Sequence, residues 1–176
     1  MQRAASWRPG RDRLTAKRLP TTKPSKAWPL DQRPGFLIRR LHQIHVALFQ
    51  KKCAAFEITP LQYSLLSALA KRGTADQTTL AADVALDRTT TTGALKRLQS
   101  RRFIERSIDH GDRRAQRCRL TRSGAKLLQQ MEMSARKAHL DTVADLSKAD
   151  QKRFIAMMQQ IVTANAGRLE ATIAID

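Results

Sequence analysis

Apolar residues recur at helical spacing from position 36 onward. Leu37, Leu41, Ile44 and Leu48 are separated by four, three and four residues, which places them on one face of a helix. Stripes with similar spacing return at positions 65–69, 80–84, 94–98, 127–138 and 154–162. The pattern predicts six helices and therefore a mainly α fold.

Capping residues predict where these helices begin and end. Thr59, Pro60 and Gln62 form a Thr-x-x-Gln capping box with proline at the first helical position. The other predicted N-caps are Asp76, Asp87, Thr121 and Ser147, and glycine is expected to end two helices, at Gly73 and Gly167. The helix capped by Asp87 is expected to reach about Arg101. Only a few residues separate Val84, in the preceding helix, from Asp87, and so tight a connection is typical of a helix-turn-helix.

After position 102 the apolar residues no longer follow helical spacing, and the new pattern predicts a β-hairpin. Residues 103–108 and 115–120 resemble short strands, and the charged segment 109–114 between them has a glycine, Gly111, where a hairpin turn needs one. We therefore predict a mainly α fold with a small β-hairpin wing, that is, a winged helix-turn-helix joined to a helical dimerisation region.

The first 33 residues differ in composition from the rest of the chain. They contain nine basic and two acidic residues, and four prolines interrupt any helical period, so we expect a disordered basic arm. Such an arm is either a solvated tail, the product of an over-extended start codon, or a segment that contacts DNA. Residues 34–176 are expected to form a single domain, with the winged helix-turn-helix lobe at 59–121 and dimerisation helices at 34–56 and 122–166.

The net charge indicates what kind of partner the protein binds. The chain has 33 Lys and Arg against 15 Asp and Glu, a net charge of +18, of which +11 lies outside the arm. This balance favours a polyanionic partner, either nucleic acid or an anionic membrane surface. The basic residues are not confined to one amphipathic helix, which argues against a membrane-surface role. A sequence-specific regulator of double-stranded DNA and a non-specific, chromatin-like nucleic-acid-binding protein both remain open.

The sequence lacks the signals that mark several other classes of protein. No apolar run of about 18 residues predicts a membrane span, and no apolar N-terminal segment predicts a secretory signal. Glycine-rich phosphate loops and the common motifs of hydrolases are missing, so we expect no enzyme. No cofactor or metal is expected either, because two cysteines without Cys/His spacing do not suggest zinc. We expect a cytoplasmic, nucleoid-associated protein.

The helix-turn-helix and hairpin segments carry a family resemblance, which extends over residues 36–166. The motifs are Leu80-Ala81, Leu86-Asp87-Arg88-Thr89-Thr90, Arg97-Leu98, Ile104-Glu105-Arg106, Asp109-x-x-Asp112-Arg113-Arg114-Ala115 and Leu120-Thr121-x-x-Gly124. In this order they resemble the MarR family of winged-helix regulators. The chain departs from that pattern at Arg102, where the family usually has glycine, and at Gly93, where a basic residue is common. The first departure predicts a less regular helix end, and the second the loss of one DNA contact.

The helix that begins after Asp87 has the composition of a recognition helix. Short polar side chains near its start suit base edges and phosphates, and basic residues further along suit phosphates. The residues expected to contact DNA are Arg88, Thr89, Thr90, Thr92, Lys96 and Arg97. Thr91 is expected to pack inward, and Arg97 has the alternative of a solvated or salt-bridged surface residue.

The hairpin tip is expected to enter the minor groove. It is small and basic, as a narrow groove of concentrated negative potential requires. We expect Arg113 or Arg114 to insert, with Asp112 pairing the other arginine. The alternative is a surface loop with an ordinary ion pair.

The resemblance also implies a dimer and an effector. One winged helix reads one half-site, so a homodimer on a pseudo-palindromic operator is expected, acting as a repressor. Members of the family commonly bind small aromatic carboxylates or phenols between the dimerisation helices and the DNA-binding lobe. The candidate pocket residues are Arg39, Arg40, His42, His45 and Tyr63. The histidines have the alternative of being satisfied interfacial residues.

Neither cysteine matches a redox sensor well. Cys53 lies near the end of the first helix, whereas the peroxide-sensing branch of the family has its reactive cysteine near the start. Cys118 lies in a strand and is expected to be a small buried hydrophobic residue. Lys51 and Lys52, close to Cys53, favour a lowered pKa of its thiol, but a sensor role is not expected.

Overall fold

The computed structural model describes residues 28–108 and 116–167, so residues 1–27 of the predicted arm and the predicted wing tip lie outside the described residues. The last residues of the predicted arm are described, and the expected disorder was wrong there, because Leu30–Gln32 form a short helix and the Arg33 guanidinium donates to the carbonyl of Trp28. The helices are η1 (Leu30–Gln32), α1 (Pro34–Lys52), η2 (Ala54–Phe56), α2 (Pro60–Arg72), α3 (Gln77–Asp83), α4 (Arg88–Ser100), α5 (Arg122–Asp141) and α6 (Lys148–Ala164). The strands are β1 (Thr74–Asp76), β2 (Ile104–Ile108) and β3 (Gln116–Leu120). This architecture confirms the predicted mainly α fold with a small β wing.

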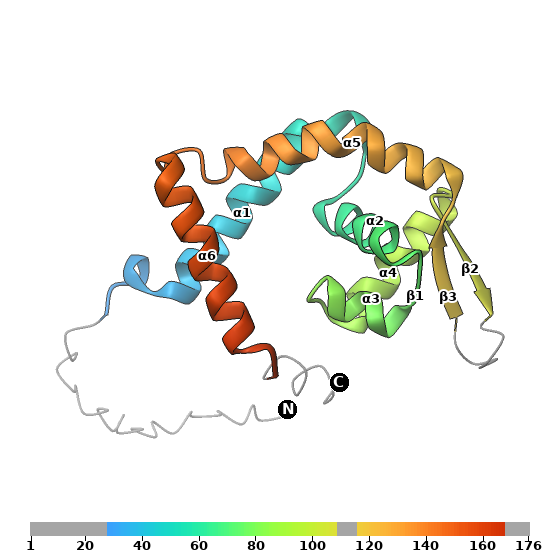
Figure 1. The fold of residues 1–176 in the computed structure, drawn as a ribbon, viewed down its shortest axis with the longest axis horizontal. Coiled ribbons are helices and arrows are strands. Elements are labelled where there is room, and N and C mark those ends of the chain that lie inside the picture. Colours follow the sequence, from blue (N-terminus) through green and yellow to red (C-terminus); the bar gives the residue numbers. More distant parts are fainter. Residues whose placement is uncertain (1–27, 109–115, 168–176) are drawn as a thin grey trace, which may run out of the picture.

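Two long helices, α1 and α5, connect the two ends of the molecule (Figure 1). Helices α1 and α5 lie side by side, and the lobe made of α2, α3, α4 and the sheet lies at one end of this pair. Helix α6 leaves the other end and stands apart from the lobe. No helix in the described ranges is long and apolar enough to cross a membrane.

The predicted N-caps are confirmed. At the start of α2 the backbone N–H of Gln62 donates to Thr59 Oγ1 (3.2 Å) and the N–H of Thr59 donates to Gln62 Oε1 (3.0 Å), which completes the capping box. The side chains of Asp76, Asp87, Thr121 and Ser147 accept the corresponding N–H at the starts of α3, α4, α5 and α6. Gly73 ends α2 with a positive φ of 75°. The prediction for Gly167 was wrong, because α6 ends at Ala164 with Asn165 at its C-cap.

The sheet has one more strand than the hairpin that the sequence predicts. Its order is β1-β3-β2, with both pairs antiparallel. Ala75 in β1 pairs with Cys118 in β3, and Cys118 pairs on its other side with Arg106 in β2. Strand β1 therefore joins the segment between α2 and α3 to the wing.

One hydrophobic core connects the lobe to the long helices. Phe49 of α1, Leu66 of α2, Leu95 of α4 and Met131 of α5 are all fully buried in it. At the base of the wing, α5 passes so close to β2 that a Cβ at Gly124 would collide with the carbonyl oxygen of Phe103. The start of α5 is therefore fixed against the end of the lobe.

Helices α3 and α4 both end in a residue with left-handed backbone conformation. After α4, Arg102 has φ 59°, its N–H donates to the carbonyl of Gln99 (2.8 Å), and the N–H of Phe103 donates to the carbonyl of Leu98 (3.0 Å). These two bonds make a complete Schellman motif. The expected irregularity of this helix end was therefore wrong, since Arg102 adopts the conformation that glycine usually provides.

Candidate nucleic-acid interface

Helices α3 and α4 form the predicted helix-turn-helix. The turn between them repeats the Schellman pattern, with Ala85 at φ 55° and the N–H of Leu86 donating to the carbonyl of Ala81 (3.1 Å). Thr91, Ala94, Leu95 and Leu98 are buried on the inner face of α4. This burial confirms the expectation for Thr91 and fixes which face of α4 points outward.

The outward face of α4 carries most of the predicted DNA-contacting residues. The exposed residues there are Thr89, Thr90, Lys96 and Arg97, with Arg88 exposed at the flank. By the 100° step of a helix, Gly93 lies near the centre of this face. The described residues on this surface are polar or basic, as contact with base edges and phosphates requires.

Asp87 stabilises the start of α4. Its carboxylate accepts the N–H of Thr90 at 2.7 Å, and this backbone hydrogen bond is the main cause that lowers the pKa of Asp87. Asp87 therefore stays ionised at neutral pH, bound to the first turn of the helix.

Thr92 differs from the other threonines of α4. Its hydroxyl donates to the carbonyl of Arg88 (2.6 Å) and accepts a hydrogen bond from Gln77 Nε2 at the start of α3. The single hydroxyl proton is therefore already used within the protein. Gln77 was not predicted from the sequence, because its role depends on how α3 and α4 cross.

The wing is described only in its strands. Arg119 on β3 forms an ion pair with Glu105 on β2 (Nε–Oε1 2.6 Å), and both are exposed. The predicted wing residues Asp112, Arg113 and Arg114 lie outside the described residues.

A row of aromatic rings connects α1, α2 and α5. His45 and His139 stack with ring centroids 4.6 Å apart, His45 lies 6.2 Å from Phe49, and Phe49 lies 5.5 Å from Tyr63. Burial is the main cause that lowers the pKa of both histidines and raises the pKa of Tyr63. Two predicted pocket residues, His45 and Tyr63, thus belong to one cluster, whereas His139 and Phe49 were missed.

The hydrogen bonds around His45 determine which ring nitrogen carries the proton when the ring is neutral. Thr142 Oγ1 lies 3.0 Å from His45 Nδ1 and donates its only proton to the carbonyl of Ala138 (2.9 Å). His45 Nδ1 must then be the donor to Thr142, which leaves Nε2 unprotonated in the neutral ring. The other predicted pocket residues, Arg39, Arg40 and His42, have exposed side chains on α1, and Arg40 bonds to Gln43.

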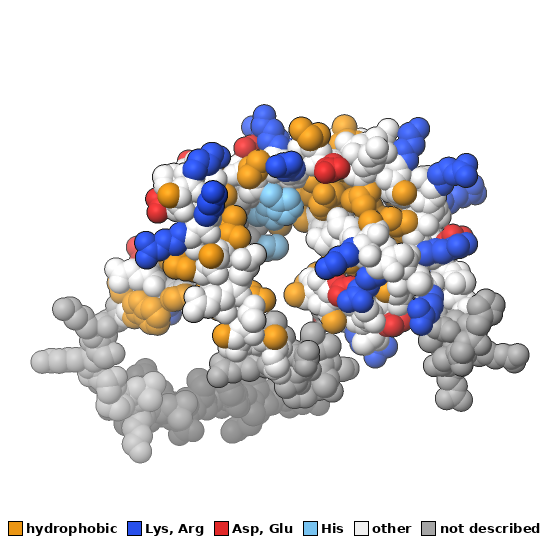
Figure 2. Space-filling model, in the orientation of Figure 1, with side chains coloured by type: hydrophobic (Ala, Val, Ile, Leu, Met, Phe, Trp, Pro, Cys, Tyr) orange, Lys and Arg blue, Asp and Glu red, His pale blue; other side chains and the backbone are white. Residues whose placement is uncertain are grey.

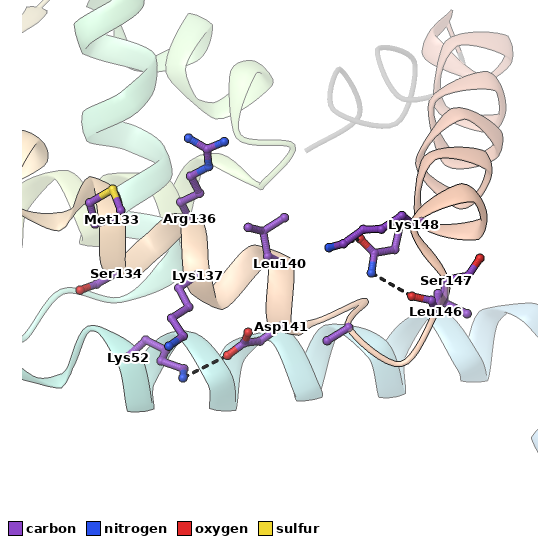
Figure 3. A pocket seen from close by; sticks show the side chains of 12 residues that line it. Lys52, Met133, Ser134, Arg136, Lys137, Leu140, Asp141, Leu146, Ser147 and Lys148 are labelled. Carbon is purple, nitrogen blue, oxygen red and sulfur yellow. Dashed lines mark hydrogen bonds and ion pairs between the residues drawn. The ribbon is translucent and has the colours of Figure 1, made fainter.

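Two hollows border α5. One, of about 380 Å³, lies between α2 and α5 and is lined by Tyr63, Ser67, Leu128 and Glu132 among others. The larger, of about 880 Å³, lies at the corner between α5 and α6 (Figure 3). Its lining residues include Lys52, Arg136, Lys137 and Lys148, with Asp141 paired to Lys52 at 3.0 Å. No sequence-predicted pocket residue lines the larger hollow.

Arg101 connects the end of the recognition helix to the segment after α1. Its guanidinium donates to the backbone carbonyls of Glu57 (2.6 Å) and Phe56 (3.2 Å) and lies 4.9 Å from the ring centroid of Phe103. No sequence signal marks this contact, because it joins residues more than 40 positions apart.

Both cysteines are buried. Each side chain is 1 % exposed, and burial raises the pKa of both thiols. Lys51 and Lys52 thus do not turn Cys53 into a thiolate, and the structure gives no support to a redox role for it.

The fold and the outward face of α4 define a winged helix-turn-helix DNA-binding protein. Comparisons with known proteins give the family. The model of the MarR family matches residues 58–115. The transcriptional repressor NicR of Pseudomonas putida is 33 % identical in an alignment of 155 residues that covers 83 % of this chain and 98 % of NicR. The chain belongs to the MarR family and is a sequence-specific DNA-binding transcription regulator.

Solved structures of two regulators show the same fold. BpsR of Bordetella bronchiseptica, whose DNA binding is regulated by 6-hydroxynicotinic acid, is 27 % identical with a TM-score of 0.72. The similarity covers 77 % of this chain and 96 % of BpsR. PcaV of Streptomyces coelicolor, solved with its natural ligand, is 29 % identical with a TM-score of 0.69, over 78 % of this chain and 97 % of PcaV.

Proposed function

We propose that the protein is a homodimeric repressor that reads the two half-sites of a pseudo-palindromic operator and is released by a small aromatic carboxylate or phenol. The outward face of α4 carries this proposal, because it presents Thr89, Thr90, Lys96 and Arg97 with no acidic neighbour on the same face. The wing residues Arg113 and Arg114, with Asp112, would add a minor-groove contact.

The homodimer is supported by apolar side chains that α6 and α1 leave uncovered. Ile161 is 64 % exposed and Val162 61 % on α6, and Ile38 is 67 % exposed on α1. Figure 2 shows hydrophobic side chains along α6, with Lys and Arg side chains among them near its start. Apolar surface of this kind is stable in water when a partner covers it. We therefore propose residues 34–56 and 122–166 as the dimerisation region and 59–121 as the DNA-binding lobe.

The dimer is tested by the mass of the protein in solution. We expect light scattering to give twice the chain mass for the wild type. The double substitution Ile161→Glu and Val162→Glu should shift the protein to monomer and weaken operator binding, whereas Lys152→Glu on the same helix is the charge-matched control. A wild type that is monomeric at micromolar concentration would overturn the dimer.

Operator recognition is tested by selection from a random duplex library at about 150 mM salt, which suppresses binding through phosphates alone. We expect a two-fold symmetric consensus that Thr90→Ala and Arg114→Ala weaken. Retention that falls smoothly with salt and shows no consensus would instead indicate a non-specific, chromatin-like nucleic-acid-binding protein.

The effector site is proposed at the hollow between α2 and α5. The aromatic row from His139 to Tyr63 ends at this hollow, and flat aromatic ligands stack well on such rings. Its volume of about 380 Å³ lies within the range of small-molecule sites. The exposed guanidinium groups of Arg39 and Arg40, with His42, would meet the carboxylate in the assembled dimer.

Calorimetric titration with 6-hydroxynicotinic acid tests this site. We expect binding that Tyr63→Ala weakens at least tenfold, together with loss of operator affinity when the ligand is added. Lys137→Gln, in the cationic hollow between α5 and α6, should bind as the wild type does. Weakening by Lys137→Gln but not by Tyr63→Ala would place the ligand in that second hollow instead.

A further inference from the structure

Gly93 lies in the middle of the recognition helix without a structural reason for glycine. Apart from proline, glycine is the least favourable residue in a helix interior. Among the described glycines only Gly73 has a positive φ, so the backbone at Gly93 does not need glycine's conformational freedom. A Cβ at Gly93 would meet no backbone atom of a neighbouring element, so close packing does not require glycine either.

The one atom that a Cβ at Gly93 would approach belongs to Arg97. Arg97 Nη1 lies 3.6 Å from that Cβ position, an ordinary van der Waals distance. Arg97 is one turn further along α4, so its side chain runs back over Gly93 toward the start of the helix. The half-burial of Gly93 on an otherwise exposed face agrees with this cover.

We propose that Gly93 and Arg97 form one base-reading unit at the centre of α4. This inference rests on the proposed operator recognition and adds the residues that determine one base. Because Gly93 has no long side chain, the guanidinium of Arg97 can lie over the centre of the outward face of α4, where base edges would meet it. Arginine reads guanine by two parallel hydrogen bonds to O6 and N7, so each half-site should contain one guanine that depends on this pair.

Three substitutions distinguish base reading by Gly93 and Arg97 from the general affinity of the protein for DNA. Arg97→Lys keeps the positive charge but loses the planar fork. Gly93→Gln places a long side chain where the guanidinium lies. Gly93→Ala adds only the methyl that the structure accommodates at 3.6 Å and is the matched control. Alanine and glutamine both favour helix more than glycine does, so neither substitution should unfold α4.

The experiment is operator selection with each purified full-length variant, followed by affinity measurement on the wild-type consensus and on random duplex. For Arg97→Lys and Gly93→Gln we expect the preference for one guanine per half-site to fall about tenfold or more, with affinity for random duplex within about threefold of the wild type. Gly93→Ala should keep the preference. Lys96→Ala should weaken all sequences alike and reduce the salt dependence, as loss of a phosphate contact does.

The outcomes distinguish this inference from the proposed function. A wild-type consensus that Arg97→Lys and Gly93→Gln leave unchanged would overturn the base-reading unit alone. Loss of the same guanine in Gly93→Ala would contradict the placement of the guanidinium. A wild type without any consensus would overturn operator recognition itself, and the base-reading unit with it.

Discussion

The imidazole rings of His45 on α1 and His139 on α5 stack at a centroid distance of 4.6 Å, at the contact between the two longest helices. His42 on α1 adds a further positive charge nearby when protonated, and Lys52 and Asp141, the ion pair between the same helices, lie further along the contact. Stacked neutral rings are compatible with this packing, whereas two imidazolium ions would repel each other.

Stability should therefore fall at mildly acidic pH. The pKa of both histidines is lowered in the folded state, so the unfolded chain binds more protons below about pH 6.5, and stability is lost as pH falls through the folded-state values. Urea unfolding between pH 5 and 8 measures this slope. His45→Gln, which removes the less exposed ring of the pair, should flatten it, and His42→Gln, on the same helix, should largely retain it. An equal slope in wild type and His45→Gln would contradict the assignment.

Gly124→Ala should destabilise the protein. The new methyl would collide with the carbonyl oxygen of Phe103, where α5 passes β2, and overpacking of this kind costs about 1–3 kcal/mol. Gly35→Ala is the control, because its Cβ would meet nothing within 4 Å. Thermal unfolding should show a lower midpoint for Gly124→Ala only, and equal midpoints would contradict the close approach.

Glycine should stabilise the two left-handed helix ends. Ala85 and Arg102 hold positive φ at a steric cost that glycine does not have, so Ala85→Gly and Arg102→Gly should each raise the free energy of unfolding by about 0.5–1 kcal/mol. Gln99→Gly, within α4, should lower it by about as much. Urea titration without DNA separates this effect from any phosphate contact of Arg102. A loss of stability in Arg102→Gly would show that its side chain contributes more than its backbone costs.

Both cysteines should resist alkylation in the native protein. Their thiols are buried and their pKa values are raised, so little thiolate is available at pH 7. Mass spectrometry after brief treatment with iodoacetamide should detect native protein without adducts and two adducts after denaturation. Rapid modification of native Cys53 would reopen a redox role.

Local signals in the sequence predicted most of the fold. The capping side chains of Thr59 and Asp87 act within three residues, and apolar periodicity identified the buried face of α4. The three residues of β1 were missed because such a short strand is defined only by its pairing with β3, more than 40 residues later.

Only part of the candidate site was predicted, because contacts between residues that lie far apart in the chain leave no local signal in the sequence. The sequence identified His45 and Tyr63 by residue type, but not Thr142, which meets His45 across 97 residues. Gln77 and Arg101 were also missed, since each acts where separate helices meet. Such helix crossings also determine which side chains of the recognition helix are already hydrogen-bonded within the protein, as that of Thr92 is.

The attachment of α5 at both ends has a mechanical consequence. At its start, Thr121 Oγ1 and Ser123 Oγ both donate to the carbonyl of Arg102, directly after the recognition helix, and at its other end His139 contacts α1. A helix of 20 residues is about 30 Å long, so a rotation of about 5° at the His139 end displaces the Arg102 end by roughly 2–3 Å. In the proposed homodimer that displacement would occur twice, and movement along the line between the two recognition helices would change their separation by about twice as much.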